Sequence, residues 1–131
     1  MVKLAILVAA LLVAASARAE CPVGQRPMLS VRLYLGQMEG GKRLTNSVWE
    51  KFLAAVVTPR FPEGYTTYDA MGRWRDLETK VIGHEPTKII EVDAPDTQEF
   101  RDKMEEIRKD YGARFHQQAV GIVSMPACGA F

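Results

Sequence analysis

The stretch VVTPRFPEGYTTYDAMGRWRD, residues 56–76, contains the change from a predicted helix to a predicted strand. Pro59 ends the helix, because a proline pushes the residue before it out of the helical region. Residues 65–74 are rich in threonine and tyrosine, which favours an extended strand. We expect the prolines and Phe61 of the connecting loop to act structurally. Arg60 could either bond the last helical carbonyls or bind an anionic ligand.

One strand and one helix are predicted before this stretch. Residues 29–35 alternate apolar and polar side chains, which is the period of a strand with one buried face. Ser47 and Glu50 have the spacing of a capping box. Apolar side chains then recur at helical spacing up to residue 57, so we expect a helix that begins near Ser47.

A strand, a helix and a final strand are predicted after it. Residues 87–92 and 119–125 have the composition of strands. The second helix is expected to start within residues 93–96, where Pro95 would be tolerated in the first turn. Its buried face is predicted from apolar residues at spacings of three and four, namely Phe100, Met104, Ile107, Tyr111 and Phe115.

This order of elements predicts an α+β fold of the ferredoxin-like kind, a four-stranded antiparallel sheet with two helices on one face. In that topology the first and last strands are antiparallel neighbours. Cys21 and Cys128 would therefore lie close together, and in an exported protein such a pair is most simply a disulfide. A redox or metal role would need a further cysteine or histidine near either position, and the sequence offers none there.

The first residues have the form of a signal peptide. A positive Lys3, an apolar run over residues 4–15 and a small-x-small pattern ending at Ala19 predict cleavage after residues 1–19. The apolar run is shorter than the roughly 18 to 20 residues needed to span a bilayer. We therefore expect a single α+β domain, residues 20–131, exported to the periplasm or the medium without a membrane anchor.

The charge balance of the mature chain argues against a nucleic-acid partner. Without Lys3 and Arg18, the 17 basic residues become 15, against 16 acidic ones. A protein that neutralises phosphates needs a basic face, and this composition does not predict one.

Several short motifs resemble those of an exported bacterial family, domain of unknown function 3574. The resemblance covers residues 29–123, and its most specific part is the Thr-Pro-Arg-Phe-Pro run at residues 58–62. The other matching positions are Leu33-Tyr34-Leu35-Gly36, Trp49, Phe52, Gly64, Thr66, Gly72, Trp74, Glu85-Pro86 and Lys88. The resemblance implies export and the limits of the domain, and it carries no activity or catalytic residue.

The predicted topology brings polar groups together at the end of the sheet that holds the second hairpin. Trp74, Arg75, His84, Glu85 and His116 should share one rim there. Histidine is the side chain best suited to move protons near neutral pH, so His84 is a candidate acid or base. The two histidines come from separate elements and lack the spacing of a zinc motif, so we predict no metal site.

The face of the sheet opposite the helices is a second candidate. If the apolar residues of the first strand face the helices, Arg32 and Tyr34 face outward beside Glu91. A second copy could cover this open face and form a homodimer with a cavity between the sheets, in which Arg32 and Tyr34 would orient an acidic or aromatic ligand. The alternative is a solvated face with a weak Arg32–Glu91 pair.

Two function classes follow from these candidates. The first is a binding or interaction module for a small ligand that could be anionic, with Arg32, Tyr34, Arg60 and Trp74 as its contacts. The second is a cofactor-independent enzyme of the dimeric α+β barrel kind, in which His84 or Tyr34 transfers a proton; it rests on fold analogy. The sequence has no phosphate loop, nucleophile motif or metal cluster, so we expect no cofactor.

Overall fold

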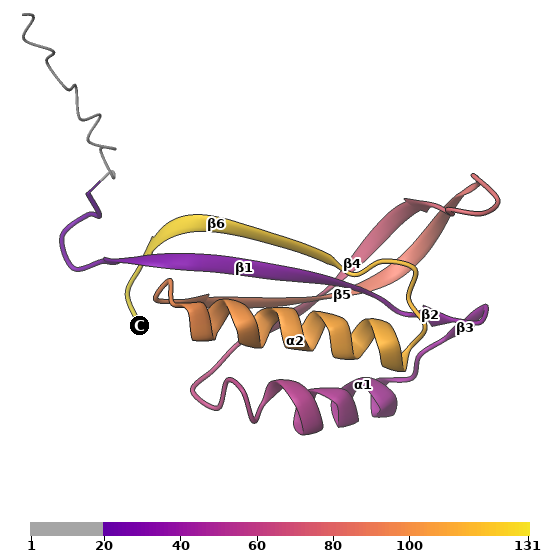
Figure 1. Ribbon diagram of the computed structural model, residues 1–131, viewed down its shortest axis with the longest axis horizontal. Helices are drawn as coiled ribbons and strands as arrows, with labels where there is room; N and C mark the ends of the chain where they lie inside the picture. The colour runs from indigo at the N-terminus through magenta and orange to yellow at the C-terminus, as the bar shows by residue number, and fades with distance from the viewer. Residues whose placement is uncertain (1–19) are drawn as a thin grey trace, which may run out of the picture.

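The computed structural model describes residues 20–131, so the signal peptide predicted for residues 1–19 lies outside the described part of the chain. Figure 1 shows a sheet with helices packed beneath it. The elements are β1 (Arg26–Gly36), β2 (Met38–Glu39), β3 (Lys42–Arg43), α1 (Asn46–Phe52), the π-helical turn η1 (Leu53–Val57), β4 (Thr66–Arg75), β5 (Ile82–Ala94), α2 (Gln98–Arg114) and β6 (Gly121–Gly129).

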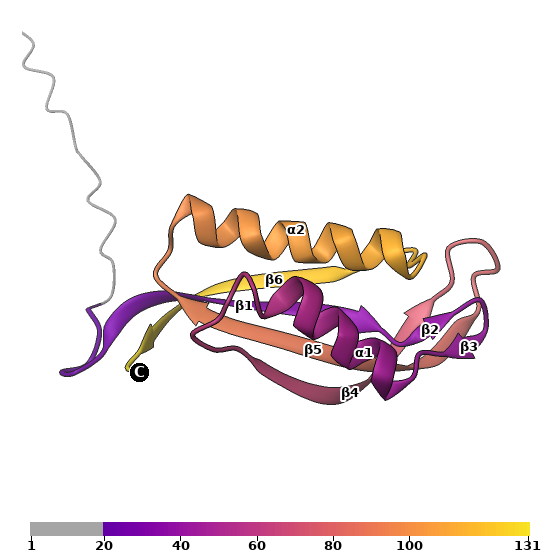
Figure 2. The same ribbon diagram turned by 90° about the horizontal axis from the view of Figure 1, so that it is seen from below.

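The main sheet has four strands in the order β4-β5-β1-β6, and every neighbouring pair is antiparallel. Both views place α1 and α2 on the same face of this sheet (Figures 1 and 2). The predicted α+β class, with a four-stranded antiparallel sheet and two helices, is confirmed. A short β2–β3 hairpin, which the sequence did not predict, follows β1.

The core lies between the sheet and the helices. As predicted, Val31, Leu33 and Leu35 of β1 are buried against them. The α2 stripe is buried from Phe100 to Tyr111, and Phe115 is partly buried. The remaining core residues are Val120, between α2 and β6, and those of α1, η1 and β5: Trp49, Phe52, Leu53, Val56, Val57, Ile90 and Val92.

Both helices begin at a threonine rather than at the predicted positions. Thr45 is extended, and its hydroxyl accepts a hydrogen bond from the Val48 amide at 3.3 Å, so the capping box predicted at Ser47 is wrong. The second helix is capped by Thr97, whose hydroxyl accepts from the Phe100 amide at 3.1 Å. Pro95 therefore precedes α2, because residues 93 and 94 are still paired with β1.

The strands also extend further than predicted. β5 starts at Ile82 because its ladder with β4 continues to the Arg75–Ile82 pair. The resulting β4–β5 hairpin projects past the helices (Figure 1). β6 runs to Gly129, since its register on β1 ends at the Arg26–Gly129 pair.

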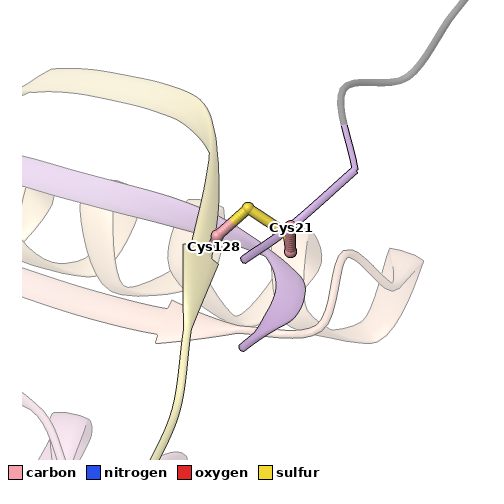
Figure 3. The surroundings of a disulfide bond; sticks show 2 residues. All are labelled: Cys21 and Cys128. Atoms are coloured by element: carbon pink, nitrogen blue, oxygen red, sulfur yellow. A yellow bond between two sulfur atoms is a disulfide. The ribbon is translucent and has the colours of Figure 1, made fainter. Parts of the chain in front are cut away.

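Cys21 and Cys128 form the predicted disulfide, with their Cα atoms 5.6 Å apart (Figure 3). The bond fastens the segment before β1 to the end of β6, where Pro27 pairs with Cys128. Within the described residues, no helix is long and apolar enough to cross a membrane.

Candidate functional site

The loop that follows η1 has structural contacts. The Arg60 guanidinium donates to the Val56 carbonyl at 2.8 Å and to the Glu106 carboxylate at 3.1 Å. Phe61 packs edge-on against Phe100, with ring centroids 5.8 Å apart. These contacts match the structural role expected for this loop, and a ligand contact for Arg60 stays a prediction.

The opposite end of the sheet holds an open cleft, here called the hairpin-end cleft, of about 660 Å³. The five residues predicted to share one rim all line it: Trp74, Arg75, His84, Glu85 and His116. Its other lining residues are Met38, Gly40, Gly41, Asp76, Leu77, Gly83, Gln117, Gln118 and Ala119. The cleft therefore collects groups from the β4–β5 hairpin, the β2–β3 hairpin and the segment after α2.

Trp74 presents a flat ring to this cleft. A Cβ atom built on Gly72 would lie 2.7 Å from the indole Nε1 and 2.8 Å from the Thr87 hydroxyl. Any larger residue at position 72 would displace the ring, so the glycine allows the indole to lie across the sheet. Trp74 is still 39% exposed, which leaves part of the ring available to a ligand.

Two oxygen acceptors meet over Gly36, and one of them belongs to Glu85, the register partner of Gly72. Glu85 Oε1 accepts from the Met38 amide at 3.1 Å. A Cβ on Gly36 would lie 2.5 Å from Glu85 Oε1 and 2.7 Å from Gln117 Oε1, so both oxygens converge over this glycine. Gln117 is held by its amide nitrogen, which donates to the Met38 and Phe115 carbonyls at 2.8 and 3.0 Å. The arrangement suits a ligand that supplies a hydrogen-bond donor.

The two histidines have ordinary surface contacts. His116 Nδ1 is 2.7 Å from Glu39 Oε1, and its side chain is 79% exposed. His84 Nε2 lies 3.5 Å from Arg73 Nη1. Across residues 20–131, no cluster of three or more potential ligand side chains could hold a metal ion.

Asp76 orders the tip of the hairpin next to the cleft. Its Oδ1 accepts from the Thr79 and Glu78 amides at 2.7 and 2.9 Å. These backbone hydrogen bonds lower the pKa of Asp76 below its ordinary value, so the carboxylate is charged at neutral pH. Gln118 donates to the other oxygen at 3.1 Å and links the tip to the segment after α2.

Arg32 and Tyr34 lie on the open face and do not line the hairpin-end cleft. Arg32 Nε donates to Glu91 at 2.5 Å, and this hydrogen bond raises the pKa of the guanidinium. The Tyr68 hydroxyl donates to the same carboxylate at 3.2 Å. Tyr34 packs on Gly121, where an added Cβ would lie 3.3 Å from the Tyr34 Cβ. Tyr34 and His84, the two predicted proton-transfer candidates, therefore lie at different sites.

Sequence reasoning missed the residues that shape the cleft. Gly36, Gly72 and Gln117 determine where the acceptors and the indole lie. In the sequence, the two glycines are singled out only as positions that match the family, and Gln117 is not singled out. It also missed the burial of Ile89 and Thr87 on the open face, at 2% and 3% exposure. Tyr34 and Tyr68 flank Ile89 in the sheet register.

A family model described as "Protein of unknown function (DUF3574)" matches residues 30–131, most of the described chain. Among curated proteins, none matches the sequence.

Two solved structures of a phage SAM lyase share the fold. The complex with S-methyl-5'-thioadenosine has a TM-score of 0.62 and 14% identity, covering 86% of this chain and 94% of that chain. The apo state has a TM-score of 0.59 and 13% identity, covering 88% and 97%. At this identity the likeness shows the fold alone.

Proposed function

The chain belongs to the DUF3574 family of proteins of unknown function, and from that premise we propose that it is a binding module whose small-molecule ligand occupies the hairpin-end cleft. One observation carries the proposal: a partly exposed indole lies across Gly72, next to the paired acceptors of Glu85 and Gln117. A flat apolar surface with a few convergent polar groups is typical of small-ligand sites.

The ligand that fits this cleft joins a flat ring to a hydrogen-bond donor. The ring would stack on Trp74, and the donor, neutral or cationic, would reach Glu85 Oε1 and Gln117 Oε1. An anionic ligand was expected from Arg32 and Arg60, but both already pair with carboxylates of the chain itself. Such a ligand would have to displace those carboxylates, so the acceptors of the cleft favour a donor instead.

The fold neighbour supports a choice of probe. S-methyl-5'-thioadenosine, the compound in the phage SAM lyase complex, has a flat adenine ring with an amino group. Adenosine monophosphate carries the same ring with a dianionic phosphate, and S-adenosylmethionine carries it with a positive charge. The three compounds therefore test the ring and the preferred charge separately.

Calorimetric titration of each compound into the purified protein tests the proposal. Stacking of a base on an aromatic ring contributes about 1–3 kcal/mol, so Trp74→Ala should weaken binding about fivefold or more. Met71→Ala is the matched control, since Met71 is 62% exposed on the same hairpin and lies outside the cleft lining. Arg60→Ala, at the other end of the sheet, should also leave the affinity unchanged.

Two results would contradict the proposal. The first is that none of the three compounds binds at millimolar concentration and a thermal-shift screen of flat-ringed amines also gives no stabilised sample. The second is a bound compound whose affinity is the same in Trp74→Ala. Chromatography of the same mixtures tests the enzyme alternative, because turnover would appear as new products.

We also infer export and a ferredoxin-like topology. The disulfide supports an oxidising compartment, since such bonds are rare where thiols are kept reduced. The strand order, with β1 between β5 and β6, supports the ferredoxin-like assignment. Detection of the processed chain outside the cytoplasm would test the first of these.

A further inference from the structure

The outer edge of β6 is protected only at Pro126, because residues 121–125 carry neither a charge nor a proline. β6 lies at one end of the sheet order, and its nine residues, GIVSMPACG, include no charged side chain. Natural proteins commonly place charges, prolines or bulges on such edges, because free N–H and C=O groups pair readily with another strand. The opposite edge, β4, carries Asp69, Arg73 and Arg75.

Apolar side chains are exposed on both sides of this edge. Ile122 is 40% exposed. It lies on the face that the helices cover, because its register partner is the buried Leu33. Val123 and Met125 are 44% and 40% exposed on the open face. An added strand would therefore gain main-chain hydrogen bonds and apolar contacts together.

Pro126 fixes which backbone groups point outward. A proline has no N–H, so within a sheet its nitrogen faces away from the ladder, here away from β1. Backbone groups alternate in direction along a strand, so Ile122 and Ser124 also direct their N–H and C=O groups to the free edge. The missing donor ends any pairing at Pro126 and leaves residues 121–125 as the usable segment.

We propose that a second copy of this chain pairs antiparallel with β6 through residues 121–125, forming an eight-stranded sheet across a two-fold axis at Val123. In this register Ile122 of one copy faces Ser124 of the other, and each such pair exchanges two hydrogen bonds. Val123 faces its own counterpart in a non-hydrogen-bonded pair. The uncharged segment is complementary to itself, as an isologous interface requires.

The size of this contact sets the expected affinity. Four main-chain hydrogen bonds and three partly exposed apolar side chains per copy form a small interface, below the roughly 800 Å² per partner of a standard complex. We expect a concentration-dependent dimer with a dissociation constant in the micromolar range or weaker. The arrangement differs from the predicted face-to-face homodimer, because it leaves Tyr68 and the centre of the open face free.

Sedimentation equilibrium of the protein, expressed from the complete coding sequence and purified, tests this proposal. Val123→Glu and Val123→Lys should each be monomeric, because like charges would meet at the two-fold axis. An equimolar mixture of the two variants should dimerise again, because opposite charges then face each other. Met71→Lys, a charge added at another exposed apolar residue, should dimerise like the wild type.

The possible outcomes separate the two interfaces. A wild-type protein that stays monomeric at several hundred micromolar would overturn the proposal, as would dimers that survive in both Val123 variants. Tyr68→Lys places a charge on the open face, on the strand farthest from β6. If that variant also dissociates the dimer, the open face rather than the edge holds the copies together.

Discussion

Removal of one buried hydroxyl, in Tyr111→Phe, should destabilise the protein although the ring remains in place. Tyr111 is fully buried, and its ring packs edge-on against Phe52 with centroids 5.1 Å apart. Its hydroxyl donates to the Gly36 carbonyl at 2.6 Å and accepts from Gln37 Nε2 at 2.7 Å. Burial raises the pKa of this hydroxyl, so it remains a donor at all ordinary pH values.

The expected loss of stability depends on the buried polar groups that lose the Tyr111 hydroxyl as a hydrogen-bond partner. A buried polar group without a partner costs about 1–3 kcal/mol. Gln37 Nε2 keeps one bond, to the Leu35 carbonyl at 3.1 Å, so the larger cost falls on the Gly36 carbonyl. We therefore expect Tyr111→Phe to lower the free energy of unfolding by about 2 kcal/mol.

Urea unfolding followed by circular dichroism measures this change. Tyr65→Phe is the matched control, because the Tyr65 hydroxyl is hydrogen-bonded to Thr58 at 2.8 Å in an exposed position. Water can replace that bond, so the control should stay within about 0.5 kcal/mol of the wild type. Equal stability of Tyr111→Phe and the wild type would refute the argument that the hydroxyl joins α2 to the end of β1.

Three further predictions concern the disulfide, the core and the hairpin tip. Reduction of Cys21–Cys128, which are 107 residues apart, should destabilise the protein by up to about 5 kcal/mol in the chain-entropy model; an unchanged melting temperature in reductant would contradict this. Phe52→Ala should cost about 3–5 kcal/mol in chemical unfolding, because Phe52 is 2% exposed, and a soluble variant of wild-type stability would contradict its core position. The pKa of Asp76 in the folded protein lies below its ordinary value of 3.8. The stabilisation that the Asp76 carboxylate gives the folded state is therefore complete above that pH and is lost as the pH falls through the folded pKa. Asp76→Asn should therefore melt with a weaker pH dependence below pH 3.8 than the wild type, and parallel melting curves would count against the hydrogen bonds of the tip.

The element order was predictable because both periodicities are clear in this chain. Alternation in β1 and the four-residue spacing in α2 reflect burial of one face, and burial dominates the stability of each element. The element ends were less predictable. Thr45 and Ser47 are both good capping residues, and only the backbone conformation decides between them.

The candidate site was predictable in its location and not in its detail. The hairpin-end residues converge because topology alone brings the β4–β5 hairpin and the segment after α2 to one end. The acceptor pair over Gly36 depends on side-chain orientation and on the strand register, which no local pattern specifies. Likewise, the carboxylate partners of Arg32 and Arg60 are 59 and 46 residues away in the chain.

The Cys21–Cys128 disulfide lies where β1 starts and β6 ends, and the hairpin-end cleft is lined by the β4–β5 hairpin, which Figure 1 shows at the opposite end of the sheet. Glu20 directly precedes Cys21 and Phe131 is three residues after Cys128, so both ends of the described chain lie near the disulfide and on the side remote from the cleft. A sensor surface, an affinity tag or a fused domain can therefore be attached at either of these residues while the cleft points into the solution. The protein is thus suited to oriented immobilisation, in which every attached molecule presents the same end to a dissolved compound.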